Sequence, residues 1–236
     1  MTKPYGMKAE LKDYPWRDLR EELDLNDIHL KIENGALEVG YDREEDEAKA
    51  KEVATLYLQT HSLRMGFKVA ANFNRTWKPT PAGGVAHAMA LQSSVKFNDR
   101  LQATIHQATI SGRARIVSQQ MVDTASFTND TLMVQKALKD PALKQAIAYF
   151  GDEVADASKP LYGVYKAIES ITNHLGKQGR KKLAQLASQS ESYISDLMET
   201  TQYSRHAVTQ ARQHLTEKEC ITRAKTLIEA YARTIS

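Results

Sequence analysis

Residues 161–171 read LYGVYKAIESI, and the apolar side chains of this stretch recur at the spacing of one helix face. The stripe consists of Leu161, Val164, Tyr165, Ile168, Ile171 and Leu175. We therefore expect a helix over Leu161–His174 that buries this face in a core. Glu169 falls beside the stripe, where its carboxylate either orients a cation or is solvated at the stripe's edge.

A final helix is marked by its start as well as by its pattern. Thr216 and, three residues later, Glu219 form a capping box. The apolar positions that follow are Ile221, Ala224, Leu227, Ile228, Tyr231 and Ile235. A short helix, SYISDLMETT, comes earlier, and we expect Tyr203-Ser204-Arg205-His206 to lie between the two helices. An arginine beside a histidine suits chemistry on a phosphate, because the guanidinium binds its oxygens and the imidazole transfers protons.

The segments LYGVYKAIESI, SYISDLMETT, YSRHA and LTEKECITRAKTLIEAYA together resemble the C-terminal part of HEPN domains. The likeness is to the MauJ and ApeA-like branch and covers about Ala125 to Ser236. It implies a helical domain of four or five helices that forms a homodimer. It also implies an RNA-directed protein in antiviral defence or stress physiology, because many HEPN proteins are metal-independent endoribonucleases with an Arg-x4-6-His motif.

The resemblance assigns a site to this part of the chain. From their chemistry, we expect Arg205 to bind the phosphate and His206 to transfer a proton. Glu169 matches an acidic position of HEPN helices, and the resemblance implies that it holds Arg205 through a salt bridge. The expected RNA-binding residues around them are Tyr203, Arg212 and His214. The positions at which the motif's catalytic histidine should fall hold Gln210, Ala211 and Arg212 instead. A catalytically lapsed RNA-binding relative therefore stays open, as does a role for Arg205 and His206 in bracing the end of the preceding helix.

A basic cluster lies between the predicted helix Leu161–His174 and the short helix SYISDLMETT. Gly176–Lys182 contains Lys177, Arg180, Lys181 and Lys182. We expect this cluster to contact an RNA backbone, with a solvated turn as the alternative. The net charge of +3 neither requires nor excludes such a partner, whereas Asp42–Glu47 is acidic, so the two halves of the chain differ in sign.

Composition excludes several other classes. The chain has 236 residues, 42% of them hydrophobic, and its single cysteine, Cys220, is expected to be a small packed residue in a reducing compartment. No run of about 18 apolar residues and no signal peptide is present, so we expect a cytoplasmic protein away from membranes. We expect neither metal nor cofactor, since no His-x3-His pair or Cys-His cluster occurs and the Pro79–Gly84 loop precedes no clear helix.

The N-terminal half changes its pattern several times. Asn34-Gly35 between two alternating stretches predicts a hairpin over Asp27–Tyr41 with a type I′ turn. A helix of about 20 residues should follow over Arg43–Arg64, with Gly66 as its stop. Further along we expect three or four strands, at residues 67–71, 85–91, 101–110 and 114–117.

After Ser126 the sequence is helical, with Asn129 or Asp130 as a first cap and Asp140-Pro141 as a second start. The predicted fold class is α+β: an N-terminal hairpin-helix-sheet domain over residues 1–122 and a HEPN-like helical bundle over residues 123–236. The leading function is RNA-directed. The alternative is a non-enzymatic protein-interaction or scaffold module that dimerises through its helices.

Overall fold

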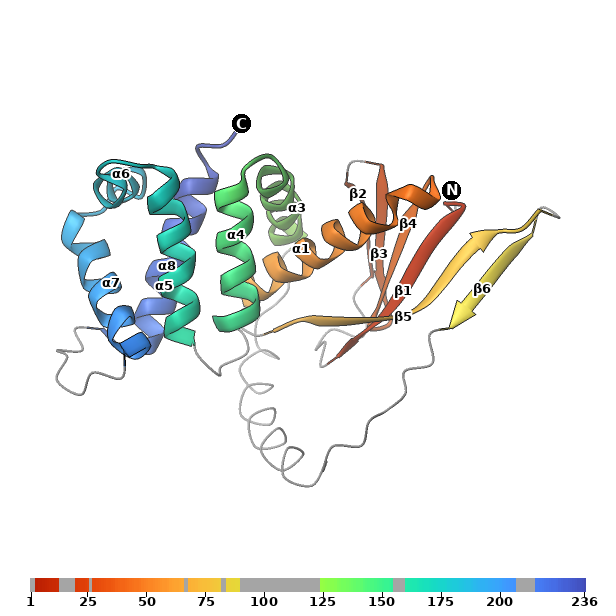
Figure 1. Cartoon of the computed structure of the whole chain (residues 1–236), viewed down its shortest axis with the longest axis horizontal. Helices are drawn as coiled ribbons and strands as arrows, with labels where there is room; N and C mark the ends of the chain where they lie inside the picture. The colour runs from red at the N-terminus through yellow and green to blue at the C-terminus, as the bar shows by residue number, and fades with distance from the viewer. Residues whose placement is uncertain are drawn as a thin grey trace, which may run out of the picture. The chain divides into compact units, whose positions relative to one another are not determined.

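The computed structural model describes residues 3–12, 20–25, 27–65, 68–81, 84–89, 124–154, 160–206 and 215–236 (Figure 1). These residues form an α+β protein, as predicted. The chain divides into two compact units, Met1–Glu52 with Ala70–Thr128 and Val53–Val69 with Asn129–Ser236. The predicted division lies at residue 122, with residues 53–69 in the first part, whereas in the structure residues 53–69 group with the helical unit.

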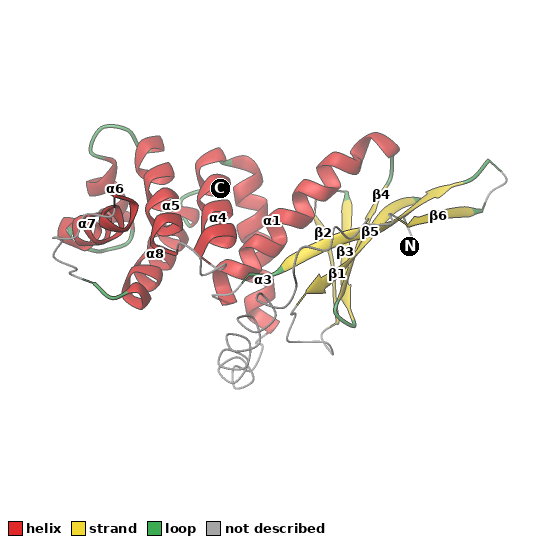
Figure 2. Cartoon of the chain, turned by 60° about the horizontal axis from the view of Figure 1, so that its bottom comes forward, coloured by secondary structure: helices red, strands yellow, loops and turns green. Residues whose placement is uncertain are grey.

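The first unit is built on one six-stranded sheet with the order β2-β3-β4-β1-β5-β6. Each strand pairs antiparallel with its neighbours, and β1 lies between β4 and β5 (Figure 2). The strands are β1 (Tyr5–Lys12), β2 (Arg20–Leu25), β3 (Ile28–Glu33), β4 (Ala36–Tyr41), β5 (Ala70–Pro79) and β6 (Val85–Met89).

The predicted hairpin is the β3–β4 pair. Asn34 and Gly35 have φ angles of 53° and 71°, and positive φ at both positions is what a type I′ turn requires. The register pairs Leu30 with Val39, and Val39 in turn with Met7 of β1. All three side chains are buried, so this face of the sheet contributes to the core.

The opposite face is charged. Lys31 pairs in register with Glu38, and Glu38 with Lys8, so charges of opposite sign alternate across β3, β4 and β1. Lys8 Nζ lies 2.7 Å from Glu38 Oε1. Such cross-strand pairs each stabilise a sheet by about 0.2–1 kcal/mol.

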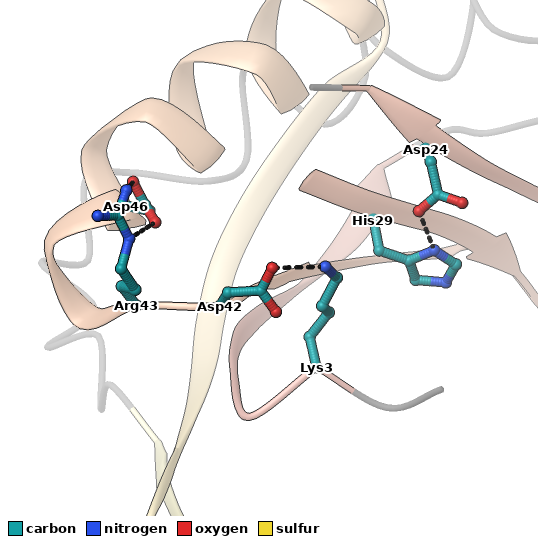
Figure 3. A network of polar contacts seen from close by, with 6 residues as sticks. All are labelled: Lys3, Asp24, His29, Asp42, Arg43 and Asp46. Carbon is teal, nitrogen blue, oxygen red and sulfur yellow. Dashed lines mark hydrogen bonds and ion pairs between the residues drawn. The ribbon is translucent and has the colours of Figure 1, made fainter. Parts of the chain in front are cut away.

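The acidic segment after β4 begins the predicted helix. A 3₁₀ turn, η1 (Glu44–Asp46), leads into α1 (Glu47–Met65), where carboxylates at the N-terminus complement the helix dipole. Arg43 Nε donates to Asp46 Oδ2 at 3.1 Å, and Lys3 Nζ donates to Asp42 Oδ2 at 2.8 Å (Figure 3). The expected stop, Gly66, lies outside the described residues.

Two strands were not predicted and one was predicted too short. β1 and β2 were not predicted from the sequence, and Pro79 was predicted to lie in a loop, whereas β5 continues through Pro79. The turn follows at Thr80, whose backbone N donates to Gly84 O at 2.8 Å. The strands expected at residues 101–110 and 114–117 fall outside the described residues.

The second unit contains the C-terminal part of α1 and the helices that follow it. They are α3 (Thr124–Lys139), α4 (Pro141–Tyr149), the π-helical turn η2 (Phe150–Val154), α5 (Pro160–His174), α6 (Gly179–Leu186), α7 (Glu191–His206) and α8 (Glu217–Ala232). α5 is central, since it packs against α4, η2, α6, α7 and α8. None of the helices that the structure describes is long and apolar enough to cross a membrane.

The helix starts were predicted with mixed success. Asp140 caps α4 and Pro141 follows it, as expected, and the capping box of Thr216 and Glu219 is present at α8. The first cap was wrong, because α3 begins at Thr124 and Asp130 lies inside it. Asp130 is buried and faces Arg64, a tertiary contact that a local pattern does not reveal.

The apolar faces of α5 and α8 are buried, as the sequence pattern predicted. Ile168 and Ile171 of α5 and Leu227 of α8 are completely buried, which confirms both predicted stripes. Cys220 is also buried, as expected of a small packed residue, and burial raises the pKa of its thiol to about 11. The thiol therefore stays protonated near neutral pH.

Candidate nucleic-acid interface

The predicted basic cluster lies in the turn between α5 and α6 and in the first turn of α6. Gly176 has a φ of +68°, a backbone conformation that favours glycine, and it turns the chain after α5. Gly179 then starts α6 in close contact with the carbonyl of Thr172, where a Cβ would overlap backbone atoms. This contact fixes the start of α6 against α5. The four cations, Lys177, Arg180, Lys181 and Lys182, are exposed.

Most of these cations have no partner in the described part of the chain. Lys182 Nζ donates to the carbonyl of Leu175 at 2.9 Å, at the end of α5. Lys177, Arg180 and Lys181 form no side-chain hydrogen bond or ion pair with another described residue. Residues 170–190 contain neither aspartate nor glutamate, and the nearest acids in sequence are Glu169 and Glu191, so the cluster is positively charged and open to solvent.

The predicted catalytic pair occupies a different place from the one expected. Tyr203-Ser204-Arg205-His206 was expected between two helices, but it forms the last turn of α7. The predicted short helix ended at Thr201, whereas α7 continues to His206. Of the other expected RNA-binding residues, Arg212 and His214 lie outside the described residues, as do the side chains of Tyr203, Arg205 and His206.

The structure does not bring the basic cluster and the catalytic pair together. Figure 1 shows the last turn of α7 at the end of the helical unit where α5 begins. The basic cluster follows the other end of α5, whose 15 residues are about 22 Å long. The predicted site residues therefore form two groups at opposite ends of this helix.

Glu169 has partners on its own helix. Its Oε1 accepts a hydrogen bond from the Tyr165 hydroxyl at 3.1 Å, and its Oε2 lies 2.6 Å from Lys166 Nζ. The hydrogen bond to Glu169 raises the pKa of Lys166. The salt bridge from Glu169 to Arg205 stays a prediction.

A second polar cluster, which the sequence analysis missed, lies at the same end of the unit as the basic cluster. Asp140 Oδ1 accepts from the backbone N of Leu143 at 2.8 Å, and its Oδ2 accepts from the Tyr231 hydroxyl at 2.8 Å. His174 Nε2 lies 3.8 Å from the same Oδ2, and its ring meets Tyr231 edge-on at 6.2 Å. Burial and the bond to Asp140 raise the pKa of Tyr231, which keeps its hydroxyl a donor.

The described chain also contains a buried charged group away from both clusters. Asp130 Oδ2 lies 2.8 Å from Arg64 Nε and 3.4 Å from His61 Nε2. Burial, together with the nearby Arg64 charge, lowers the pKa of His61 to about 3, so the imidazole is neutral and the ion pair is between Arg64 and Asp130. Lys225 Nζ donates to the Arg64 carbonyl at 2.7 Å. His61 is fully buried, so this group joins α1, α3 and α8 rather than meeting a ligand.

Over the described residues, no three histidine, cysteine, aspartate or glutamate side chains are arranged to hold a metal ion. Comparisons with family models, curated proteins and solved structures find no match for this chain. The likeness to HEPN domains therefore stays a prediction that rests on the sequence segments alone.

Proposed function

We propose that this chain is an RNA-directed, HEPN-like protein whose helical unit binds RNA phosphates through the basic cluster. The observation that carries the proposal is the position of three cations, Arg180, Lys181 and Lys182, in the first turn of α6 without an acidic residue beside them. The homodimer and the cytoplasmic location are part of the same proposal.

Cations at this position lower the stability of the helix when no anion is bound. The N-terminus of a helix carries a partial positive charge, so Arg180 and Lys181 there each cost about 0.3–1 kcal/mol, and aspartate or glutamate is preferred. Lys182 offsets this cost by donating to the Leu175 carbonyl after α5. A phosphate reverses the sign of this effect, because it is attracted by the positive end of the helix dipole and by the side-chain charges together. Exposed residues that oppose such a local preference, as these cations do, are expected where a ligand binds.

Arg205 and His206 are the proposed catalytic residues of a metal-independent cleavage. In this reaction the histidine removes or donates a proton and the arginine stabilises the charged phosphorus centre. A second copy of the chain, bound through the helices, would supply a second pair. A relative that binds RNA without cutting it would retain the basic cluster alone.

The test is cleavage of labelled total RNA by the purified protein in EDTA, with filter binding to the same RNA measured in parallel. Arg205→Ala and His206→Ala are compared with the controls Arg43→Ala and His87→Ala, which change exposed residues of the sheet unit. We expect EDTA-resistant cleavage that both site variants lose and both controls keep. Binding without cleavage would leave the lapsed RNA-binding form. Neither binding nor cleavage would overturn the proposal and favour the non-enzymatic interaction module.

A further inference from the structure

We propose that RNA is held by the whole end of the helical unit at which α3, α5 and α8 finish, and not by the α5–α6 turn alone. This inference rests on the proposed function and extends its binding surface. We call this region the end surface. It consists of Lys136 and Lys139 of α3, the segment Lys177–Lys182, and Arg233 after α8.

Hydrogen bonds and a ring contact join these segments to one another across the end of the unit. Lys136 Nζ donates to the Ala232 carbonyl at 3.0 Å, and Lys139 Nζ donates to the Ser236 carbonyl at 2.9 Å, which holds α3 against the end of α8. Tyr231 then contacts both Asp140 and His174, the last residue of α5. The basic segment follows His174 directly, so the cations of three separate stretches share one end.

The charge of this end is almost all of one sign. Residues 131–148 contain Lys136, Lys139 and Lys144 and a single acid, Asp140. Residues 170–190 contain four cations and no acid, and residues 230–236 contain one cation, Arg233, and no acidic side chain; Glu169 and Glu229 precede these two stretches. Asp140 is only 14% exposed, and each of its oxygens already accepts a hydrogen bond. Its charge is therefore directed into the unit rather than toward the solvent.

A purely structural role explains only part of this charge. Lys136, Lys139 and Lys182 bind carbonyls at or near helix C-termini, where cations are favoured. A carbonyl uses one of the three N–H groups of a lysine, so two remain for a ligand. Arg233, like Lys177, Arg180 and Lys181, has no hydrogen bond or ion pair from its side chain to any described residue. These four cations stabilise no contact in this part of the fold.

The spread of the cations indicates a polymer rather than a small anion. Neighbouring helices pack about 8–10 Å apart, so an end formed by several helices extends over roughly 20–30 Å. One small anion cannot reach across such a surface, whereas a phosphate backbone presents charges along its whole length. The surface is also rich in lysine, which is depleted at protein–protein interfaces.

The same residues indicate that the backbone is bound without reading the bases. Base recognition in single strands depends on exposed aromatic rings. Residues 170–190 contain no phenylalanine, tyrosine or tryptophan, Tyr231 is 3% exposed, and the half-exposed ring of His174 lies against Tyr231. We therefore expect binding that depends steeply on salt and little on sequence. An RNA held here must extend about 22 Å along α5 to reach the last turn of α7.

The experiment measures fluorescence anisotropy of labelled RNA oligonucleotides of two unrelated sequences over a range of salt concentrations. The oligonucleotides are 2′-O-methylated, so that the proposed metal-independent cleavage, which needs the 2′ hydroxyl, does not cut them during the titration. The decisive variant is Lys136→Ala with Lys139→Ala, because both residues lie outside the α5–α6 turn. Its charge-preserving partner is Lys136→Arg with Lys139→Arg, and its matched control is Lys49→Ala with Lys218→Ala, two exposed lysines elsewhere. Circular dichroism verifies that each variant is folded.

We expect the double alanine variant to bind both RNAs about tenfold or more weakly and to lose roughly one unit of salt slope per lysine. The arginine variant and the control should bind like the wild type. Wild-type affinity in the double alanine variant, with weak binding by Lys177→Ala/Lys181→Ala, would overturn the inference and leave the proposed function standing. No RNA binding by the wild type at low salt would instead overturn the proposed function. Equal competition by polyglutamate at matched charge would indicate an acidic protein as the partner and also overturn the inference.

Discussion

The hydroxyl of Tyr231 donates a 2.8 Å hydrogen bond to Oδ2 of Asp140, a residue 91 positions earlier in the chain. The other oxygen of Asp140 accepts from the backbone N of Leu143 as the N-cap of α4. The Asp140 carboxylate therefore caps the start of α4 and also links the α3–α4 connection to the last turns of α8. This arrangement holds together the end of the unit on which the basic residues lie.

Removing either partner of this bond should destabilise the helical unit. Tyr231→Phe loses one hydrogen bond and is expected to cost about 1 kcal/mol. Asp140→Ala loses the same bond and the N-cap as well, so about 2 kcal/mol is expected. Because both changes remove one shared interaction, the double variant should cost less than their sum. Urea unfolding of the four proteins measures this coupling, and strictly additive costs would contradict it.

The buried His61 makes stability depend on pH. Its pKa is lowered from 6.5 to about 3 in the folded state, chiefly by burial. Between these values the unfolded chain binds a proton that the folded chain does not, so stability falls as the pH is lowered through this window. The contribution of this one residue is at most about 1.4 kcal/mol per pH unit.

The variant His61→Gln tests this dependence, since it has no titrating group. It should be less stable than the wild type at pH 7, because a packed side chain is replaced, yet its stability should fall less steeply between pH 6.5 and 3. His87→Gln, at an exposed position, is the control and should follow the wild type. The measurement is the urea midpoint as a function of pH. Equal slopes in His61→Gln and the wild type would show that His61 does not titrate as inferred.

The capping box of α8 should contribute measurably to stability. Thr216 Oγ1 accepts from the backbone N of Glu219 at 3.3 Å, and the Thr216 backbone N donates to Glu219 Oε2 at 2.7 Å. Thr216→Ala removes the first bond and is expected to cost about 1 kcal/mol. The matched control is Thr222→Ala, an exposed position inside the same helix, where alanine should be neutral or slightly stabilising. Thermal unfolding compares the two, and equal effects would argue against the cap.

The parts of the fold that the sequence predicted are those with local signals. The hairpin follows from Asn34-Gly35, and α5 and α8 follow from apolar stripes and, for α8, its capping box. β1 has the alternation of Met7, Ala9 and Leu11, but it was not predicted, and Gly6 at its start is a residue that weakens strands. In the structure Gly6 lies under the ring of Trp77, which leaves no room for a Cβ. That reason is visible only once β1 and β5 are paired.

The same limit applies to the candidate site. The cluster from Lys177 to Lys182 is contiguous and was predicted, whereas the rest of the end surface comes from α3 and from the segment after α8. Only the packing of the helices makes these residues neighbours. Asp130 was interpreted as a cap because aspartate favours caps, and its actual partner, Arg64, lies far away in the sequence.

Substitutions of two glycines, Gly176 and Gly179, distinguish the effect of the stability of the α5–α6 turn from the effect of the position of its charged side chains. At Gly179 a Cβ would overlap the carbonyl of Thr172, so Gly179→Ala must push the start of α6 away from α5 and move Arg180, Lys181 and Lys182. At Gly176 nothing lies within 4 Å, and alanine meets only the strain of a φ of +68°, about 1 kcal/mol. We therefore expect Gly179→Ala to weaken RNA binding severalfold at a temperature where it is still folded, while Gly176→Ala lowers the melting temperature and binds RNA like the wild type. Melting curves and anisotropy titrations on the same samples measure both effects. Unchanged binding by folded Gly179→Ala would mean that the position of the first turn of α6 does not matter for RNA, against the role proposed for its cations.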